Sequence, residues 1–493
     1  MAKPAREQGS INIGKKTFLT ALIILLLLMV TVGVLTQVVP TGSYDRQMTD
    51  GRETIIDGSF HLTQTERFPI WRWFTAPVEV LWSADGPVVI VIIFFLMAVS
   101  AAFSLLEKSD VMSYAIFRVV KCFGHVKYLL LAVVVFLFML MGAVLGTFEE
   151  NIALVPILIA LSYCLGWDSL VGLGMSMLAS CFGFTAAIMN PFSIAITQKI
   201  SGLPLYSGFG YRLIIFAVYY VLVFLFLYRY ARKIERNPEK SLVIGEDAAL
   251  REKYRDVGSL NSLFGAKSPE EFQRVKRAAG AFAMLIVLIA GLILMVSFVP
   301  ALSDITLPLI GLLFLIGGCV SAAIAGIPLK RLLAIIGGSV AGIAPGILLI
   351  LLAMSVKFII SNGGIMDTIL YYTSGAILAA SPFAAILLIY ALVLLLELFV
   401  GSSSAKAFLV MPIIAPLSDL IGVTRQTSVL AFCFGDGFSN MIYPTNPVLL
   451  ICLGLTVVTF PKWFKWTYKL QIASLSIACV FLVIGVAIHY GPF

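Results

Sequence analysis

Residues 187–193 read Ala-Ile-Met-Asn-Pro-Phe-Ser and residues 443–447 read Tyr-Pro-Thr-Asn-Pro, so one Asn-Pro step recurs 256 positions further along the chain. Other prolines and glycines keep the same offset, as in Pro156 with Pro412 and Gly166 with Gly422. The sequence therefore contains two copies of one unit. Matched breaks in corresponding apolar segments are typical of secondary transporters, in which discontinuous helices hold substrate and ions near the middle of the bilayer.

The composition indicates the class of protein. Of the 493 residues, 60% are hydrophobic and 12% are charged, and the mean hydropathy is +1.02. These values are typical of a polytopic α-helical membrane protein, which has the lipid bilayer as a partner. The seven cysteines are scattered without CxxC pairs, which argues against a metal site or a disulfide framework. With three histidines and no HExxH, GxSxG or Walker motif, we expect neither an enzyme nor a cofactor.

Seven apolar segments have the length of a membrane span. They are residues 18–39, 87–106, 211–230, 278–299, 305–325, 338–360 and 466–489. Two further apolar regions, 128–166 and 382–422, are each interrupted by a short polar connection. Because the second arm of the first region is too short for a full span, we interpret both regions as re-entrant hairpins with polar tips at mid-membrane.

The predicted fold is all-α, with two inverted repeats that each contain a re-entrant hairpin and a broken transmembrane helix. The predicted parts are a first repeat at 1–230 (hairpin 128–166, broken helix 169–200), a cytoplasmic linker at 231–277, and a second repeat with an extra span at 278–493 (hairpin 382–422, broken helix 425–456). We call the two hairpins hairpin one and hairpin two. Each broken helix follows its hairpin directly in the sequence.

The distribution of positive charge supports this topology. The segments that it assigns to the cytoplasm hold 25 of the 34 Lys and Arg residues, so the positive-inside rule predicts a cytoplasmic N-terminus and an external C-terminus. Hairpin one then enters from the cytoplasm and hairpin two from outside, which makes the repeats inverted. The net charge of +8 follows from the topology, and we expect no nucleic-acid partner.

The two hairpin tips carry opposite charges. Their polar residues are Glu149, Glu150 and Asn151 in tip one, and Ser402, Ser403, Ser404 and Lys406 in tip two. Carboxylates inside a membrane need a partner, a proton, an ion or water, so we expect the two acids to face a polar cavity. The alternative is a solvated turn at the membrane surface. Lys406 and Glu150 form an internal ion pair, or together they bind a zwitterionic ligand. A third hypothesis is that the Lys406 ammonium replaces a sodium ion at the tips.

The broken helices supply the other candidate residues. Proline removes a backbone donor and disfavours helix at the preceding residue, which frees carbonyl groups for an ion while an Asn amide binds polar groups of a substrate. On this reasoning the site includes Asn190, Pro191, Thr445 and Asn446. Asp436 is a further acid in an apolar segment and suits proton or sodium coupling, or pairing with a neighbour. Lys357 and Glu397 are weaker candidates, which would serve equally as a structural pair.

At these residues the chain resembles the YfcC-like branch of the anaerobic dicarboxylate carrier (DcuC-like) family in the ion transporter superfamily. The matching motifs are Glu149-Glu150, Met189-Asn190-Pro191-Phe192, Gly401-Ser402 and Gly435-Asp436-Gly437-Phe438-Ser439. Members of this branch are described as basic amino-acid antiporters, including arginine/ornithine exchangers. The resemblance implies an elevator-type fold, a homodimer and the cytoplasmic (inner) membrane of a bacterium. Lys406 departs from the family pattern, in which this position is uncharged.

Two functions remain open. In an exchanger of amino acids, Glu149 or Glu150 binds the amino or side-chain cation, while Lys406 and backbone donors bind the carboxylate. In a proton- or sodium-coupled carrier of C4-dicarboxylates or other short organic anions, Lys406 binds the anion and the acids serve coupling. A lysine beside the ligand would repel the side chain of arginine or ornithine, which favours the second function. We rank the amino-acid exchanger first.

Overall fold

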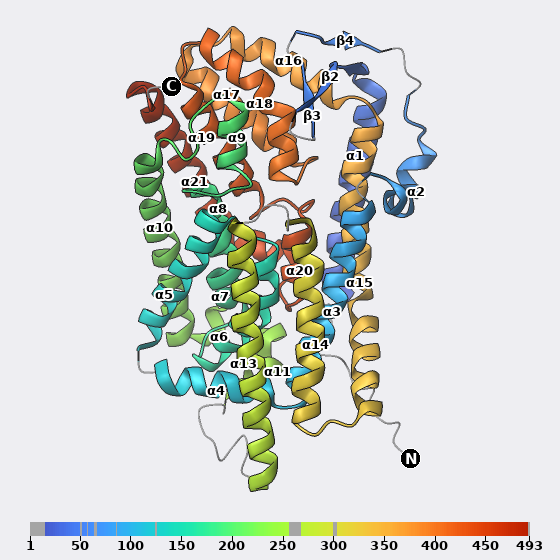
Figure 1. Cartoon of the computed structure of the whole chain (residues 1–493), viewed down its shortest axis with the longest axis vertical. Helices are drawn as coiled ribbons and strands as arrows, with labels where there is room; N and C mark the ends of the chain where they lie inside the picture. Colours follow the sequence, from blue (N-terminus) through green and yellow to red (C-terminus); the bar gives the residue numbers. More distant parts are fainter. Residues whose placement is uncertain are drawn as a thin grey trace.

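The computed structural model describes residues 15–49, 52–56, 58–63, 67–84, 86–123, 126–255, 268–298 and 303–491. Helices dominate this part of the chain, and they run mostly along the long axis of the molecule (Figure 1). Seven helical segments are long and apolar enough to span a membrane: Val89–Lys108, Lys127–Leu145, Ser169–Ala186, Phe209–Arg236, Leu329–Asn362, Ser403–Leu420 and Phe460–Ala487. The prediction of a helical protein with several membrane spans is therefore confirmed.

The first half contains two interrupted helical regions between continuous helices. Its elements are α1 (Lys15–Val38), α3 (Gly86–Lys108), α4 (Val111–Phe123), α5 (Lys127–Leu140), η3 (Met141–Leu145), η4 (Glu150–Leu154), α6 (Val155–Cys164), α7 (Ser169–Leu173), η5 (Gly174–Leu178), α8 (Ala179–Ala186), α9 (Ile194–Ile200) and α10 (Phe209–Arg236). The turn at residues 146–149 separates α5 and η3 from η4 and α6. The irregular stretch 187–193 separates α8 from α9. Both breaks lie where the sequence predicts them.

The second half repeats this order of elements. It comprises α13 (Pro269–Phe298), α14 (Ser303–Ile324), α15 (Leu329–Asn362), α16 (Met366–Leu378), α17 (Pro382–Glu397), α18 (Ser403–Leu420), α19 (Arg425–Ser439), α20 (Pro447–Gly454) and α21 (Phe460–Ala487). The break at 440–446 coincides with the predicted Asn-Pro interruption. The break at 398–402 reaches the predicted polar residues of the tip only at Ser402, because Ser403, Ser404 and Lys406 already belong to α18. In Figure 1, α5 and α6 lie in the lower half of the molecule and α17 and α18 in the upper half.

The corner that follows each hairpin has the same backbone hydrogen bonds in both halves. Gly166 and Gly422 both adopt the left-handed conformation, with φ of 85° and 71°. The amide of Trp167 donates to Ser162 O at 2.9 Å, and at the positions 256 residues later the amide of Val423 donates to Ser418 O at 3.0 Å. These are the bonds of a glycine C-cap that ends a helix. The repeat seen in the sequence therefore extends to local geometry.

The next helix also begins alike in the two halves. Asp168 caps α7 by accepting from Val171 N at 3.0 Å, and Thr424, which is 256 positions later, caps α19 by accepting from Thr427 N at 3.3 Å. Side-chain caps of this kind satisfy backbone donors that a helix start leaves unpaired. The segment from α7 to α8 is entirely enclosed by protein, and every residue of α19 after Arg425 is buried. These two broken helices therefore form the centre of the molecule.

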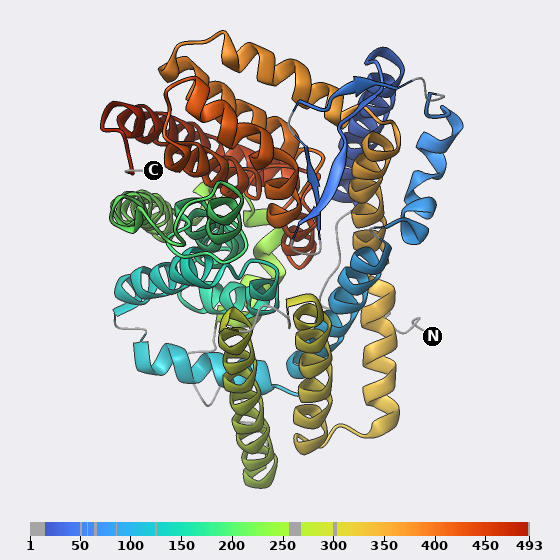
Figure 2. The same cartoon turned by 45° about the horizontal axis from the view of Figure 1, so that its top comes forward.

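The segment between α1 and α3 covers one end of the molecule. It contains the paired strands β1 (Gly42–Ser43) with β4 (His61–Leu62) and β2 (Arg46–Thr49) with β3 (Arg52–Ile55), followed by α2 (Trp71–Glu79) and η1 (Val80–Trp82). Figure 2 shows β2 and β3 beside the helices of the second half, where β3 packs against α18 and β1 against α16. Trp71, Phe74 and Trp82 are exposed, as is typical of aromatic residues at a membrane interface.

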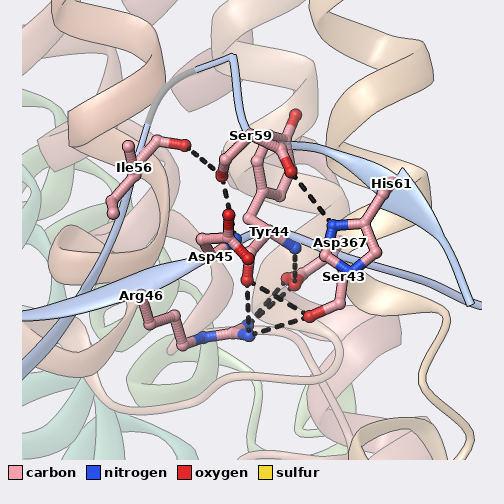
Figure 3. A network of polar contacts seen from close by, with 8 residues as sticks. All are labelled: Ser43, Tyr44, Asp45, Arg46, Ile56, Ser59, His61 and Asp367. Atoms are coloured by element: carbon pink, nitrogen blue, oxygen red, sulfur yellow. Dashed lines mark hydrogen bonds and ion pairs between the residues drawn. The ribbon is translucent and has the colours of Figure 1, made fainter.

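A polar network fixes this segment to the second half of the chain (Figure 3). Asp367 at the start of α16 accepts two hydrogen bonds from the Arg46 guanidinium, at 2.8 and 3.0 Å, and one from Tyr44 N at 3.0 Å. Ser59 Oγ in turn accepts from Asp45 N. Because both partners are charged, these hydrogen bonds are stronger than bonds between neutral groups. The outer segment of the first half is therefore held on α16, next to hairpin two.

The linker between the halves docks mainly on the first half, and its Glu246 also pairs with Lys462 of α21 in the second half. Its helix α11 (Ile244–Arg255) carries Asp247, which is fully buried. Asp247 accepts from Tyr163 Oη at 2.6 Å, from Ser169 N at 2.9 Å and from Ser169 Oγ at 2.9 Å. Burial raises the pKa of the Asp247 carboxyl to about 6. The linker thus contributes a buried acid, a role the sequence does not predict.

Candidate functional site

The break in the first broken helix lies against hairpin one. Asn190 Oδ1 accepts from Phe192 N at 2.8 Å and Ser193 N at 3.2 Å, so the side chain closes its own turn. Its amide nitrogen donates to Gly142 O in η3 at 3.4 Å. Gly146, the first residue of the tip, approaches so closely that a Cβ there would lie 2.4 Å from Asn190 Oδ1. Asn190 and tip one therefore pack directly against each other.

The break in the second broken helix is built in a related way. Asn446 Oδ1 accepts from Leu449 N at 3.1 Å and caps α20, while its amide nitrogen donates to Asn440 Oδ1 at 2.6 Å. Tyr443 Oη donates to Leu394 O in α17 at 2.8 Å, which ties the break to hairpin two. Thr445 and Pro191, at the two breaks, are both half-buried. The amides of both Asn residues are thus used within the protein to hold the breaks in shape.

Tip one combines an exposed acid with a buried amide. Glu149 lies in the turn before η4 and is exposed, and the Glu150 side chain lies outside the described residues. Asn151 is buried and donates to Thr147 O at 3.0 Å and to Ser180 Oγ at 2.9 Å. These bonds fix the tip on the first broken helix. Of the predicted tip-one residues whose side chains are described, Glu149 is accessible and Asn151 positions the tip.

Tip two also has exposed and buried parts. Ser402 is exposed and is the N-cap of α18, and Ser404 is half-buried in the first turn. Ser403 Oγ donates to Asp436 Oδ2 at 2.6 Å. The first turn of α18 directs its backbone donors toward the tip, and such a helix start favours negative charge. Tip two therefore offers both a potential anion site and a contact to the second broken helix.

Lys406 is enclosed at this junction. Its side chain has no exposed surface, and its Nζ donates to Asp436 Oδ1 at 2.8 Å. The same Nζ is in ion-pair contact with Glu397 Oε2 at the end of α17. The Phe432 ring lies below the ammonium, with its centroid 5.6 Å away. We call Lys406, Glu397, Asp436 and Ser403 the lysine cluster.

The lysine cluster changes the prediction for tip two. The sequence suggests Glu150 as the partner of Lys406, or a ligand carboxylate, whereas the structure gives it Glu397 and Asp436. Both acids are buried, with side-chain exposures of 2% and 1%. Two carboxylates and one ammonium give a formal charge of −1, and charge inside a protein is costly unless it is paired. Lys406 is therefore neutralised inside the protein.

Glu397 is the residue that the sequence analysis underrates. It ends an apolar arm of hairpin two, and the sequence suggests Lys357 as its partner. The signal that could have identified it is the spacing of nine residues from Lys406 across a hairpin tip, which brings the end of α17 next to the start of α18. A tip that reverses the chain places such residues on facing arms. Lys406 is therefore paired between the two arms of hairpin two and not between the two tips.

The two halves meet close to the lysine cluster. Gly437, one residue after Asp436, approaches the backbone of α8 so closely that a Cβ there would lie 2.4 Å from Thr185 Cα and Thr185 N. A side chain at this position would push α19 and α8 apart, which explains the glycine. Within the described part of the chain, no group of three His, Cys, Asp or Glu residues suits a metal ion. The crossing of the broken helices thus lies directly behind the acid of the cluster.

Comparison with known proteins relates the whole chain to transporters. The family model for DcuC, described as C4-dicarboxylate anaerobic carrier, matches residues 18–487. The chain is 28% identical over 485 residues to a protein of Escherichia coli (strain K12) named "Putative basic amino acid antiporter YfcC", covering 90% of this chain and 91% of that protein.

Two solved structures cover most of the chain at low identity. The YdaH transporter of Alcanivorax borkumensis is 16% identical with a TM-score of 0.39, covering 97% of this chain and 100% of that one. The antimetabolite efflux pump MtrF of Neisseria gonorrhoeae is 17% identical with a TM-score of 0.42, covering 93% and 94%. With the family model matching nearly from end to end, the chain belongs to the DcuC family of membrane transporters.

Proposed function

We propose that the protein is a secondary active transporter that exchanges small amino acids of the basic type, such as arginine and ornithine, by alternating access. The observation that carries the proposal is the neutralisation of Lys406 by Glu397 and Asp436. A free ammonium at tip two would repel a cationic side chain. An ammonium that is enclosed with two carboxylates does not, because its charge is neutralised within the protein. The name of the Escherichia coli relative supports the same substrate class.

In this proposal, tip one binds the cationic groups of the substrate and tip two binds its carboxylate. Glu149, exposed at tip one, and its neighbour Glu150 bind the amino or guanidinium cation of the substrate. Exposed Ser402, half-buried Ser404 and the backbone donors at the start of α18 bind the substrate carboxylate. Asn151, Asn190 and Asn446 hold the tips and breaks in position through the hydrogen bonds described above. Pro191 and Thr445 lie half-buried at the two breaks.

The arrangement of the halves supports a moving transport domain. Hairpin one lies in the lower half of the molecule and hairpin two in the upper half, with α7 beside α6 and α19 beside α17, which is compatible with inverted repeats (Figure 1). We infer that hairpins and broken helices move together against a scaffold of outer helices, in a homodimer in the cytoplasmic membrane. The N-terminus faces the cytoplasm and the C-terminus the outside, as the charge distribution predicts.

The second candidate is a carrier of C4-dicarboxylates or other short organic anions, coupled to protons or sodium. It is favoured by the printed description of the family and by the helix start at tip two, which suits a carboxylate. In this function Lys406 would have to leave its buried partners to reach the anion. Separation of a buried ion pair costs about 3–5 kcal/mol, which is why we place this candidate second.

Counterflow in proteoliposomes tests the proposal. Purified protein is reconstituted into vesicles that contain arginine, ornithine, succinate or lactate, and uptake of labelled arginine and labelled succinate is followed without sodium. We expect labelled arginine to accumulate only in vesicles loaded with arginine or ornithine. Saturation of the initial rate distinguishes a carrier from a channel. Uptake confined to succinate would refute the amino-acid proposal and support the second candidate.

A matched pair of variants assigns the effect to tip one. Glu150→Gln removes a proposed substrate contact, and we expect it to abolish arginine counterflow while the protein remains folded and inserted. Glu79→Gln changes an acid of α2 that is paired with Arg72 far along the outer segment, and it should leave exchange intact. Normal exchange by Glu150→Gln would remove this residue from the site.

A further inference from the structure

The lysine cluster has one more negative charge than positive charge. Lys406 contributes one ammonium, whereas Glu397 and Asp436 contribute two carboxyl groups, and all three side chains are at least 98% buried. A net charge enclosed in protein is disfavoured, and the usual response is a bound proton or a bound cation. The start of α18 offsets only part of this charge, because a helix end corresponds to about half an elementary charge.

From this geometry we infer that the lysine cluster binds one proton, which resides on Glu397. The inference deepens the proposed function, because it names a coupling ion at the junction of hairpin two and the second broken helix. When hairpin two opens to water, the carboxylates become hydrated and the net negative charge is no longer buried. The proton then leaves Glu397 for water, and the carboxylate that remains keeps Lys406 as its counter-ion.

The surroundings of the two acids decide which one holds the proton. Asp436 accepts from Lys406 Nζ at 2.8 Å and from Ser403 Oγ at 2.6 Å, and both bonds stabilise its charged form. Apart from its contact with Lys406, the Glu397 carboxyl accepts no hydrogen bond within the described part of the chain. Glu397 is also the last residue of α17, where the helix end disfavours negative charge.

A metal cation fits this position less well than a proton. Sodium-like cations need several oxygen ligands around one point, and here the Lys406 Nζ already lies between the two carboxyl groups. Other charged and titratable groups lie further out. Cys433 on α19 interacts electrostatically with Lys406, and Arg212 on α10 interacts with Cys433. The ammonium thus has the place of a cation, and the remaining charge is matched by a proton.

Infrared spectroscopy of the purified protein tests the inference without any substrate. The carbonyl stretch of a protonated carboxyl group is recorded at neutral pH in sodium-free buffer for wild type, Glu397→Gln and Asp436→Asn. We expect a wild-type band that is lost in Glu397→Gln. It should also be lost in Asp436→Asn, because Lys406 then faces a single carboxylate and the cluster is neutral. Asp367→Asn, which alters an acid held by Arg46, should keep the band.

The outcomes separate this inference from the proposed function. A band of equal strength in wild type and both cluster variants would overturn the inference, and so would a wild-type band that disappears when sodium is added at constant pH. Vesicles containing a pH-sensitive dye then connect the proton to transport, with proton movement expected on arginine addition in wild type and not in Glu397→Gln. Arginine exchange without the infrared band would refute the inference alone. The band without exchange of any amino acid would refute the proposed function alone.

Discussion

The two hairpins share their backbone arrangement but differ in whether their charged side chains are exposed or buried. Both consist of two helical arms around a short break, and both are followed by a left-handed glycine and a side-chain helix cap at equivalent positions. Tip one leaves an acid, Glu149, exposed, whereas hairpin two encloses its lysine with two acids. Tip one therefore presents an accessible negative charge that suits a cationic ligand. Hairpin two keeps its charged groups paired inside the protein.

The corner after each hairpin differs in a parallel way. In the first half, Tyr163 and Ser169 bind Asp247 of the linker. The equivalent residues of the second half, Asp419 and Arg425, form an ion pair with each other, which is largely exposed. A repeated backbone thus accepts different side-chain solutions. The positions of the helix breaks are therefore the same in the two repeats, whereas the charged residues at the breaks and their partners differ.

The largest effect is expected from removal of the cation in hairpin two. Lys406→Gln leaves two carboxyl groups buried without a counter-ion, which should destabilise the protein by about 3–5 kcal/mol. We also expect transport to acquire a sodium requirement, because a free cation would then occupy the vacated position. Thermal unfolding and counterflow with and without sodium measure both effects. Lys199→Gln, a change of an exposed lysine on α9, is the control. Sodium-independent exchange at normal stability would contradict the account.

The two Asn-Pro breaks should respond unequally to the same substitution. Asn190→Ala removes the bonds to Phe192 N, Ser193 N and Gly142 O and so detaches the first break from tip one. We expect it to abolish arginine exchange in a protein that is still folded. Asn446→Ala removes a helix cap, worth about 1 kcal/mol, and should reduce exchange only partly. The measurement is the initial rate of arginine exchange by each variant, normalised to the amount of reconstituted protein. A normal rate for Asn190→Ala would separate the break from the site.

Docking of the linker on the first half should depend on pH through Asp247. Because burial raises the pKa of Asp247 to about 6, the docked state holds more protons than the undocked state between about pH 4 and 6. Docking is therefore strongest below this range and weakens as the pH rises through about 6, by at most about 3 kcal/mol. Hydrogen exchange of residues 244–255, corrected for intrinsic rates, measures it. Asp247→Asn should flatten the dependence, and an unchanged profile would contradict this cause.

The smallest and most symmetric effect is expected at the two corner glycines. Gly166 and Gly422 are left-handed, and a Cβ at either would meet no atom within 4 Å. Gly166→Ala and Gly422→Ala should each therefore cost only the strain of the left-handed backbone, about 1–2 kcal/mol. Thermal unfolding of both variants gives the comparison. Costs that differ several-fold would show that the corners are not equivalent in energy.

The sequence predicts most of the frame because prolines, glycines and apolar lengths determine it. The breaks near Asn190 and Asn446 and the two hairpin regions lie within a few residues of their predicted bounds. The helical order of the first half could be extended to the second because one offset relates them. Those signals are local, so a single chain is sufficient to read them.

The partners of charged residues could not be predicted in the same way. The sequence offers Lys406 a partner in Glu150, a ligand carboxylate or the place of a sodium ion, whereas the structure pairs it with Glu397 and Asp436 on neighbouring helices. Asp247 lies in a polar linker that composition alone marks as solvated, yet it is buried. Such pairings depend on how helices rotate and cross, as at Gly437 against Thr185. The outer strands were missed because they are only two to four residues long.

The most direct test of the account is a charge-restoring double variant. Lys406→Gln alone makes the formal charge of the lysine cluster −2, and Lys406→Gln combined with Glu397→Gln returns it to the wild-type value of −1. If Lys406 acts as an internal counter-ion, the double variant should recover sodium-free arginine counterflow and stability lost in the single variant. If the double variant is as inactive as Lys406→Gln alone, Lys406 contacts the ligand itself, and the internal neutralisation of hairpin two is wrong.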